Sequence, residues 1–137
     1  MRRFFVFAIC LLALAPAFEA ANAADSQKGS IQRSWISTSS GGKGANQFSV
    51  AKVKRLYANF TWKTPAAAGQ VLTIEWRDPK GALRARWKDK TIKADKTGTR
   101  LFAWVGSGLV KGKPGSWRAV LSVGNKPISS HRFRIVA

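Results

Sequence analysis

The sequence predicts an all-β protein, a single sandwich of about seven antiparallel strands. Three observations support this prediction. Apolar and polar residues alternate in short segments from about residue 56 to the end of the chain, as they do in half-buried strands. Turns rich in Gly and Pro separate these segments, and no helical periodicity of useful length interrupts them. Strands at this spacing without helices are typical of a β-sandwich.

The chain begins with the three parts of a secretory signal peptide. A basic end is followed by an apolar run at residues 4–17 and by a small-residue A-N-A cleavage sequence at residues 21–23. A membrane anchor would need about 20 apolar residues, and Pro16 and Glu19 interrupt the run too early. We therefore expect residues 1–23 to be removed and the protein to be exported, either to a periplasm or out of the cell.

Cleavage would leave a small, strongly basic domain without cysteine. The 137-residue chain would lose 23 residues, leaving 114, which suffices for one domain. Its single cysteine, Cys10, would leave with the signal peptide, so packing alone must hold the fold. The 24 basic and 6 acidic residues would become 22 and 5, a formal charge of +17. Such a charge attracts anionic partners, although it does not determine the fold.

Residues 24–47 are expected to form a flexible N-terminal arm, because they are rich in Ser, Gly and Lys. A short strand around Trp35, at residues 31–37, is compatible with this composition. The folded domain is then expected to span residues 48–137.

Within this domain, most alternating segments place their large apolar residues on one side. The segments are residues 56–63, 72–77, 83–90, 101–105, 117–123 and 131–135. The segment at residues 101–105 is apolar on both parities, and we expect a strand buried on both sides. The other segments should turn one side to the core and one to solvent. We expect one core containing Trp62, Ile74, Trp76, Trp87, Trp117, Leu121 and Phe133.

The register of the first hairpin follows from parity. A loop of two or four residues within residues 78–81 keeps the apolar residues of both strands on the same side, whereas a three-residue loop would turn one strand inside out. The favoured register places Glu75 opposite Arg84 and Thr73 opposite Arg86. One acid would then face one base on the outer side.

Cations gather on the outward parity of two hairpins. They are Arg84, Arg86, Lys88 and Lys90 on the first, and Arg118, Arg132 and Arg134 on the second. One interpretation is a solvated strand face, on which lysines also discourage edge-to-edge aggregation. The alternative is an anion-binding surface, and the repetition of the pattern in a chain of this charge favours it.

Two of the six tryptophans do not fit the apolar parity. The other four lie on the same parity as the apolar residues of their strands and are assigned to the core: Trp62, Trp76, Trp87 and Trp117. Trp35 and Trp104 are candidates for stacking on a sugar ring, a nucleobase or an acyl chain. The alternative is that each indole covers the second face of a sheet.

No catalytic site, metal site or cofactor is expected. Beyond the signal peptide the chain has one histidine, His131, no thiol, and five carboxylates: Asp25, Glu75, Asp78, Asp89 and Asp95. His131 shares the parity of Phe133 and Ile135, and is expected to be a partly buried strand residue with one hydrogen bond. Catalysis needs a positioned nucleophile, acid, base or metal. We therefore expect a protein that is not an enzyme.

Two stretches resemble a known family. KPGSWRAVLSVGNKPISSHRFRIVA, residues 113–137, resembles the closing hairpin of bacterial exported immunoglobulin-like or fibronectin-III-like domains. LTIEWRDPKGAL, residues 72–83, is similar to their central hairpin. The resemblance implies an immunoglobulin-like sandwich used as a binding or spacer module, with no catalytic residues to carry over. Unlike antibody-type members, this chain lacks the cysteine pair.

Two classes of function remain. The leading hypothesis is a small exported binding module whose basic faces engage an anionic envelope component: a lipid head group, a glycan or an acidic protein. Peripheral membrane contact is compatible with it. The alternative is a protein-interaction or structural envelope module, or a secreted antigenic protein of adhesin-like type, in which the charge is only solubilising. Nucleic acid is a third partner class. Binding by counterion release weakens steeply with salt, whereas an apolar interface does not.

Overall fold

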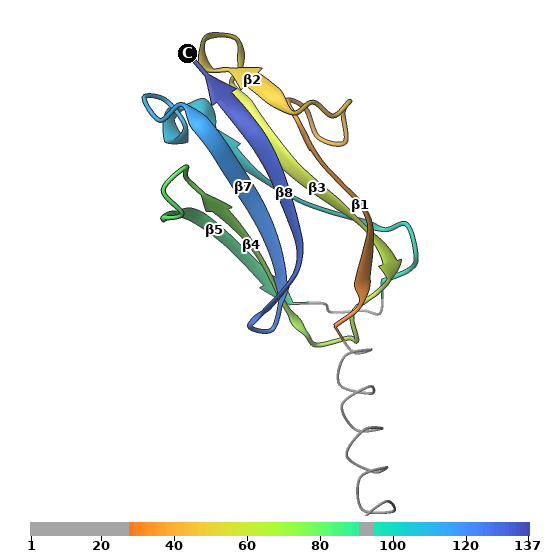
Figure 1. Cartoon of the computed structure of the whole chain (residues 1–137). Coiled ribbons are helices and arrows are strands. Elements are labelled where there is room, and N and C mark those ends of the chain that lie inside the picture. The colour runs from red at the N-terminus through yellow and green to blue at the C-terminus, as the bar shows by residue number, and fades with distance from the viewer. Residues whose placement is uncertain (1–27, 91–94) are drawn as a thin grey trace, which may run out of the picture.

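Eight strands form two β-sheets that pack face to face in the computed structural model (Figure 1). The structure describes residues 28–90 and 95–137, without the side chain of Lys90. The strands are β1 (Ser30–Ser37), β2 (Gln47–Ser49), β3 (Arg55–Thr64), β4 (Val71–Arg77), β5 (Leu83–Lys90), β6 (Arg100–Gly106), β7 (Gly115–Val123) and β8 (Lys126–Val136), with 3-10 turns η1 (Val50–Lys52) and η2 (Ser107–Leu109). No helix in these ranges is long and apolar enough to cross a bilayer.

The strand order is that of an immunoglobulin-like sandwich. One sheet has the order β1-β3-β6 and the other β2-β8-β7-β4-β5. In the immunoglobulin fold, β1, β3 and β6 correspond to strands A, B and E. In the other sheet, β8, β7 and β4 correspond to strands G, F and C, and β2 and β5 are additional strands at its two edges. The predicted fold class is confirmed, with two refinements. There are eight strands, and β2 runs parallel to β8 while every other pair is antiparallel.

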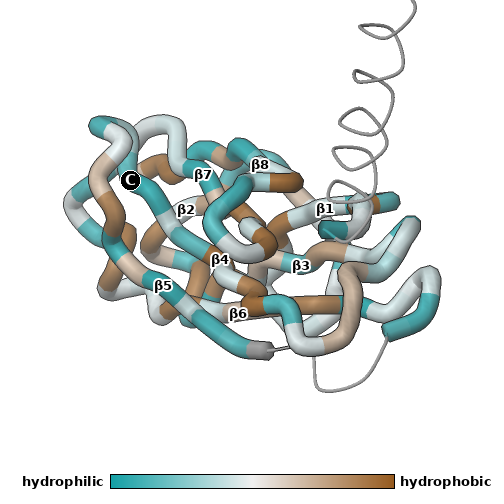
Figure 2. Tube along the Cα trace, turned by 90° about the horizontal axis from the view of Figure 1, so that it is seen from below, coloured by the Kyte–Doolittle hydropathy of each residue, from teal (hydrophilic) through white to brown (hydrophobic). Residues whose placement is uncertain are grey.

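Three tryptophans are the largest fully buried side chains. Trp62, Trp76 and Trp117 are at most 1% exposed. The ring of Trp76 meets that of Phe133 edge to face, with centroids 5.8 Å apart. Two of the three indole nitrogens are hydrogen-bonded, since Trp62 donates to the Asp95 carboxylate and Trp117 to the Lys113 carbonyl, each at 2.8 Å. Figure 2 shows the underlying pattern, in which hydrophobic and hydrophilic residues alternate along the strands.

The expected core is confirmed with two corrections. Trp87 is only half-buried, because β5 is the edge strand of its sheet and Trp87 borders an open groove there. Trp62 belongs to a smaller adjoining cluster with Ala66, Leu72 and Val123, so the buried residues divide into two groups.

The expected domain boundary at residue 48 is too late by one strand. β1 pairs with β3 along its length, and Ile36 is fully buried opposite Ala58. Beyond β1 the chain remains attached to the sheet, since the Ala45 amide donates to the Ile36 carbonyl at 3.0 Å. The short strand expected around Trp35 is therefore part of the sandwich. Residues 1–27, including the expected signal peptide and the start of the arm, lie outside the described residues.

The first hairpin keeps the expected parity but not the expected register. The Asp78 amide donates to the Ala82 carbonyl at 3.0 Å, and the Ala82 amide donates to the Asp78 side-chain oxygen at 2.9 Å, which leaves a three-residue loop. A bulge at Arg84 then adds one unpaired residue and restores the parity that such a loop would reverse. As a result Glu75 lies opposite Arg86 rather than Arg84, and Thr73 lies opposite Lys88.

β6 is not buried on both sides, contrary to the expectation for residues 101–105. Ala103 and Val105 face the core, whereas Phe102 and Trp104 are 40% and 50% exposed. Since this sheet has only three strands and nothing described covers its outer side at β6, the apolar residues of the second parity face solvent.

Candidate functional site

The outer face of the five-stranded sheet is strongly basic, and we refer to it as the basic face. Its cations are Arg77, Arg86, Lys88, Arg118, Arg132 and Arg134. They point away from the core because their neighbours along each strand, among them Trp76, Trp117 and Phe133, are buried. The alternation of strand residues thus gathers cations from four strands onto one surface.

Three arginines form a row across neighbouring strands. Arg77 on β4 pairs in register with Arg118 on β7, and Arg118 pairs with Arg132 on β8. Side chains directly opposite each other in a sheet have Cβ atoms about 4.5–5.5 Å apart, and like charges there are destabilising. The arrangement therefore costs folding free energy that an anion lying over the row would recover.

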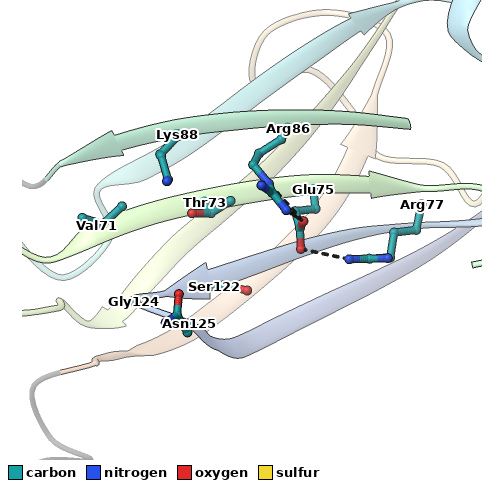
Figure 3. Close-up of a pocket in the computed structure, with 9 residues that line it drawn as sticks. All are labelled: Val71, Thr73, Glu75, Arg77, Arg86, Lys88, Ser122, Gly124 and Asn125. Atoms are coloured by element: carbon teal, nitrogen blue, oxygen red, sulfur yellow. Dashed lines mark hydrogen bonds and ion pairs between the residues drawn. The ribbon is translucent and has the colours of Figure 1, made fainter. Parts of the chain in front are cut away.

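One carboxylate stands on the described strands of this face. Glu75 accepts hydrogen bonds from the Arg86 guanidinium at 2.7 and 3.1 Å, and one from Arg77 at 3.4 Å (Figure 3). The hydrogen bond from Arg86 lowers the pKa of Glu75, and burial opposes this without reversing it. Glu75 thus engages one end of the arginine row, while Arg118 and Arg132 have no acidic partner among the described residues.

Two open hollows lie on the basic face. The first, of about 400 Å³, is lined by Glu75, Arg77, Arg86 and Lys88 together with the end of β7 (Figure 3). The second, of about 320 Å³, lies between the turn at residues 78–81 and the pair Arg118 and Arg132. Because Arg77 and Arg118 are register partners, the two hollows are neighbours. Together they suit an extended anionic ligand better than an enclosed small molecule.

Most of the predicted anion-binding residues share this face. Arg86, Lys88, Arg118, Arg132 and Arg134 do so. Two others do not add to it. Arg84 is the extra residue of the bulge and lines a separate hollow with Lys80 and Lys113. The side chain of Lys90 lies outside the described residues.

Arg77 was missed, although its parity with Glu75 in residues 72–77 is readable from the sequence. The three-residue loop and the bulge bring it opposite Leu83, at the end of β5.

The outer face of the three-stranded sheet has a different chemistry, and we refer to it as the aromatic–arginine face. Three arginines lie over aromatic rings, with guanidinium carbon to ring centroid distances of 4.5 Å for Arg33 and Trp35, 4.2 Å for Arg55 and Trp104, and 4.5 Å for Arg100 and Phe102. Tyr57 lies beside Phe102, with ring centroids 6.4 Å apart. Each arginine is attracted by the negative face of its ring.

Asn59 is the buried polar centre of this face. Its side-chain nitrogen donates to the Ser37 hydroxyl at 2.9 Å, and its side-chain oxygen accepts from the Arg100 guanidinium at 2.8 Å. Arg100 also donates to the Ser40 hydroxyl at 3.0 Å. Asn59 therefore fixes Arg100 and the loop after β1 against the sheet. Sequence reasoning missed Asn59, because in an alternating strand it reads as an ordinary outward residue.

The two candidate stacking residues differ in exposure. Trp35 is half-buried, its indole nitrogen donates to the Gly42 carbonyl at 2.9 Å, and Gly44 packs so closely that a Cβ there would lie 3.0 Å from the Trp35 Cβ. It serves to anchor the loop over the sheet. Trp104 is half-exposed and carries only Arg55 on one face. Of the two, Trp104 is therefore the one open to a ligand.

His131 bridges the two sheets. Its Nδ1 lies 3.1 Å from the Ser34 hydroxyl of β1, and its Nε2 is buried without a partner among the described residues. Burial lowers its pKa. The expected half-buried histidine with one hydrogen bond is confirmed. In the described ranges, no three His, Cys, Asp or Glu side chains come together as metal ligands would.

No protein-family model and no curated protein sequence matches the chain. Among solved structures it is similar to an immunoglobulin-like protein from Pseudomonas aeruginosa, at 10% identity and a TM-score of 0.49, over 80% of this chain and 90% of that one. It is also similar to part of the β-glucosidase from Listeria innocua in complex with glucose, at 15% identity and a TM-score of 0.45, over 77% of this chain and 16% of the enzyme. The immunoglobulin-like class follows from the strand order of the chain itself.

Proposed function

We propose that the protein is an exported, non-catalytic binding module whose basic face holds an anionic component of the cell envelope. The observation that supports this most directly is the row of Arg77, Arg118 and Arg132 on three neighbouring strands. A fold that needed only solubility could spread its cations apart. Here they are in register, where their repulsion is greatest and where an anion gains most.

The basic face suits a ligand with repeated negative charges. Arginine binds carboxylate and phosphate groups through two parallel N–H bonds, and the hollows beside the row leave room for such groups. The excess positive charge of the chain, formally +18 over all residues, raises the rate of encounter. The candidate partners are anionic lipid head groups, acidic glycans and acidic proteins, which share this chemistry.

Titration with inorganic polyphosphate tests the proposal, at about 50 mM and about 200 mM salt. The variant Arg118→Gln with Arg132→Gln removes two charges from the row. The matched control, Lys52→Gln with Lys111→Gln, removes two charges from exposed residues in η1 and in the loop after η2. We expect the row variant to weaken binding about tenfold at low salt and to flatten its salt dependence, with a much smaller effect of the control.

Equal weakening by both variants would contradict the proposal, because the charge would then act without regard to position. The alternative, an interaction module with solubilising charge, would take its place. Absence of salt-sensitive binding in the parent protein would have the same consequence.

A further inference from the structure

We propose that the aromatic–arginine face is a second binding surface, which takes a glycan whose sugar rings carry carboxylate groups. This inference does not rest on the basic face, because the two surfaces lie on opposite sheets of the sandwich. It rests on three features: an exposed apolar strip, cations that have no acidic partner in the described part of the chain, and the short distance between the two.

The apolar strip is formed by neighbouring residues of β6. Phe102 and Trp104 are two of the three exposed large hydrophobic residues in the described chain, the third being Leu83 on β5. They stand two residues apart on one side of an extended strand, about 6.6 Å from each other. Exposed rings so placed on a flat sheet give a surface on which the C–H faces of sugar rings can stack.

The cations of this face are held by neutral groups. Arg100 is bonded to the oxygens of Asn59 and Ser40, and lies over Phe102. Asp89 lines the same groove between β5 and β6 as Arg100. Neither Arg33 nor Arg55 forms an ion pair with a described carboxylate. Among the described residues no acceptor is hydrogen-bonded to the guanidinium of Arg33 or of Arg55, so the N–H groups of these two arginines are available for an anion.

The distance between ring and cation selects the class of ligand. The guanidinium of Arg55 lies 4.2 Å from the ring centroid of Trp104. An anionic group attached directly to the ring that stacks on Trp104 therefore lies close to the Arg55 guanidinium without a long spacer. A sugar acid has this arrangement, because its carboxylate is bonded to the ring carbon skeleton. In a nucleotide, the ribose separates the phosphate from the base.

The shape of the surface favours an extended glycan over a membrane. Phe102 and Trp104 are 40% and 50% exposed and lie on a sheet rather than at a protruding tip. Insertion into a bilayer needs apolar residues that reach below the head groups. A polymer of flat rings instead makes contact along the sheet.

Calorimetric titration of the full chain with an oligogalacturonate, a carboxylated sugar polymer, tests this inference. The neutral oligogalactoside of the same length and a single-stranded DNA serve as comparison ligands. We expect Trp104→Thr to weaken oligogalacturonate binding about tenfold, as loss of a stacking partner does. Arg55→Gln should weaken oligogalacturonate binding while leaving any binding of the neutral oligomer unchanged.

Leu83→Thr is the matched control, since it removes an exposed apolar side chain from a different sheet. Circular dichroism of each variant establishes that the fold is retained. Unchanged oligogalacturonate binding by Trp104→Thr would overturn the inference. So would tight DNA binding that depends on Trp104, if oligogalacturonate fails to bind.

The two proposals can fail separately. Polyphosphate has charge but no ring, so Trp104→Thr should leave its binding unchanged, and Arg118→Gln with Arg132→Gln should reduce it. If both sets of variants affect both ligands equally, a separate second surface is excluded.

Discussion

The two outer faces of the sandwich hold their arginines in different ways. On the basic face, Arg77, Arg118 and Arg132 lie opposite one another, and of the three only Arg77 is paired with a described carboxylate, that of Glu75. On the aromatic–arginine face, each arginine lies over a ring. A row of like charges responds mainly to the number of negative charges that it meets. Arginines held on rings also restrict where an anion and its attached ring can lie, so this face should discriminate more between ligands.

Both faces depend on the same hydrophobic core, and the largest expected effect on stability comes from a substitution in that core. Trp117→Ala should lower the free energy of unfolding by about 3–5 kcal/mol, because the indole is fully buried. Trp104→Ala should change it by less than about 1 kcal/mol, because half of that side chain already faces water. Urea unfolding of both variants measures the difference. Similar losses would mean that Trp104 is structural and that the comparison between the faces is wrong.

The arginines of the aromatic–arginine face should not be equivalent. Arg100→Ala should cost about 1–3 kcal/mol of unfolding free energy, since it removes the shortest hydrogen bond to the buried oxygen of Asn59. Arg55→Ala removes only a stacking contact on an exposed ring and should cost about 0.5–1 kcal/mol. Urea unfolding again provides the measurement. Equal costs would show that Asn59 does not depend on Arg100 for its position.

On the basic face, removal of an arginine should raise the free energy of unfolding instead of lowering it. Arg118→Gln should raise the free energy of unfolding by about 0.2–1 kcal/mol, because it relieves repulsion from Arg77 and Arg132. The same substitution should weaken polyphosphate binding. A variant that is more stable and binds less well would identify the row as a functional arrangement that costs stability. Destabilisation by Arg118→Gln would show that the three guanidinium groups do not repel one another.

The fold was predictable because the alternation of apolar and polar residues along each strand can be seen directly in the sequence. Trp62, Trp76 and Trp117 alternate with polar residues and are all buried. The predicted register of the hairpin differs from the observed one by two positions. The three-residue loop reverses the parity and the bulge at Arg84 restores it, so the alternation of apolar and polar residues does not reveal either of them. The polar composition around β1 predicts an arm with at most a short strand, and it does not show that this strand belongs to the sandwich, although Ile36 is fully buried.

The candidate sites were predictable only in part. The cations of the basic face could be read from parity on two hairpins. The aromatic–arginine face could not, because Phe102 and Trp104 belong to a segment that is apolar on both sides, and only the number of strands in the sheet decides which side is covered. The link between Asn59 and Arg100 joins residues 41 positions apart, so local sequence does not reveal it.

The smallest expected effect is a dependence of stability and of polyphosphate binding on pH. This dependence should involve the basic face and not the aromatic–arginine face. The pKa of Glu75 is lowered from its ordinary value of 4.5, chiefly by the hydrogen bond from Arg86. The stability that this carboxylate contributes is therefore present above pH 4.5 and is lost as the pH falls through the lowered value. Protonation also removes the one acid of the arginine row, so polyphosphate binding should strengthen over the same interval.

His131 gives a separate window at higher pH. Burial lowers its pKa from 6.5, so the unfolded chain takes up a proton first and stability declines as the pH falls from 6.5 toward the lowered value. Urea unfolding across pH, with Glu75→Gln and His131→Gln, separates the two windows. Glu75→Gln should abolish the lower window and the gain in polyphosphate binding, whereas His131→Gln should abolish the upper window and leave binding unchanged. Because neither residue lies on the aromatic–arginine face, a pH dependence of oligogalacturonate binding that Glu75→Gln or His131→Gln abolishes would contradict the independence of the two surfaces.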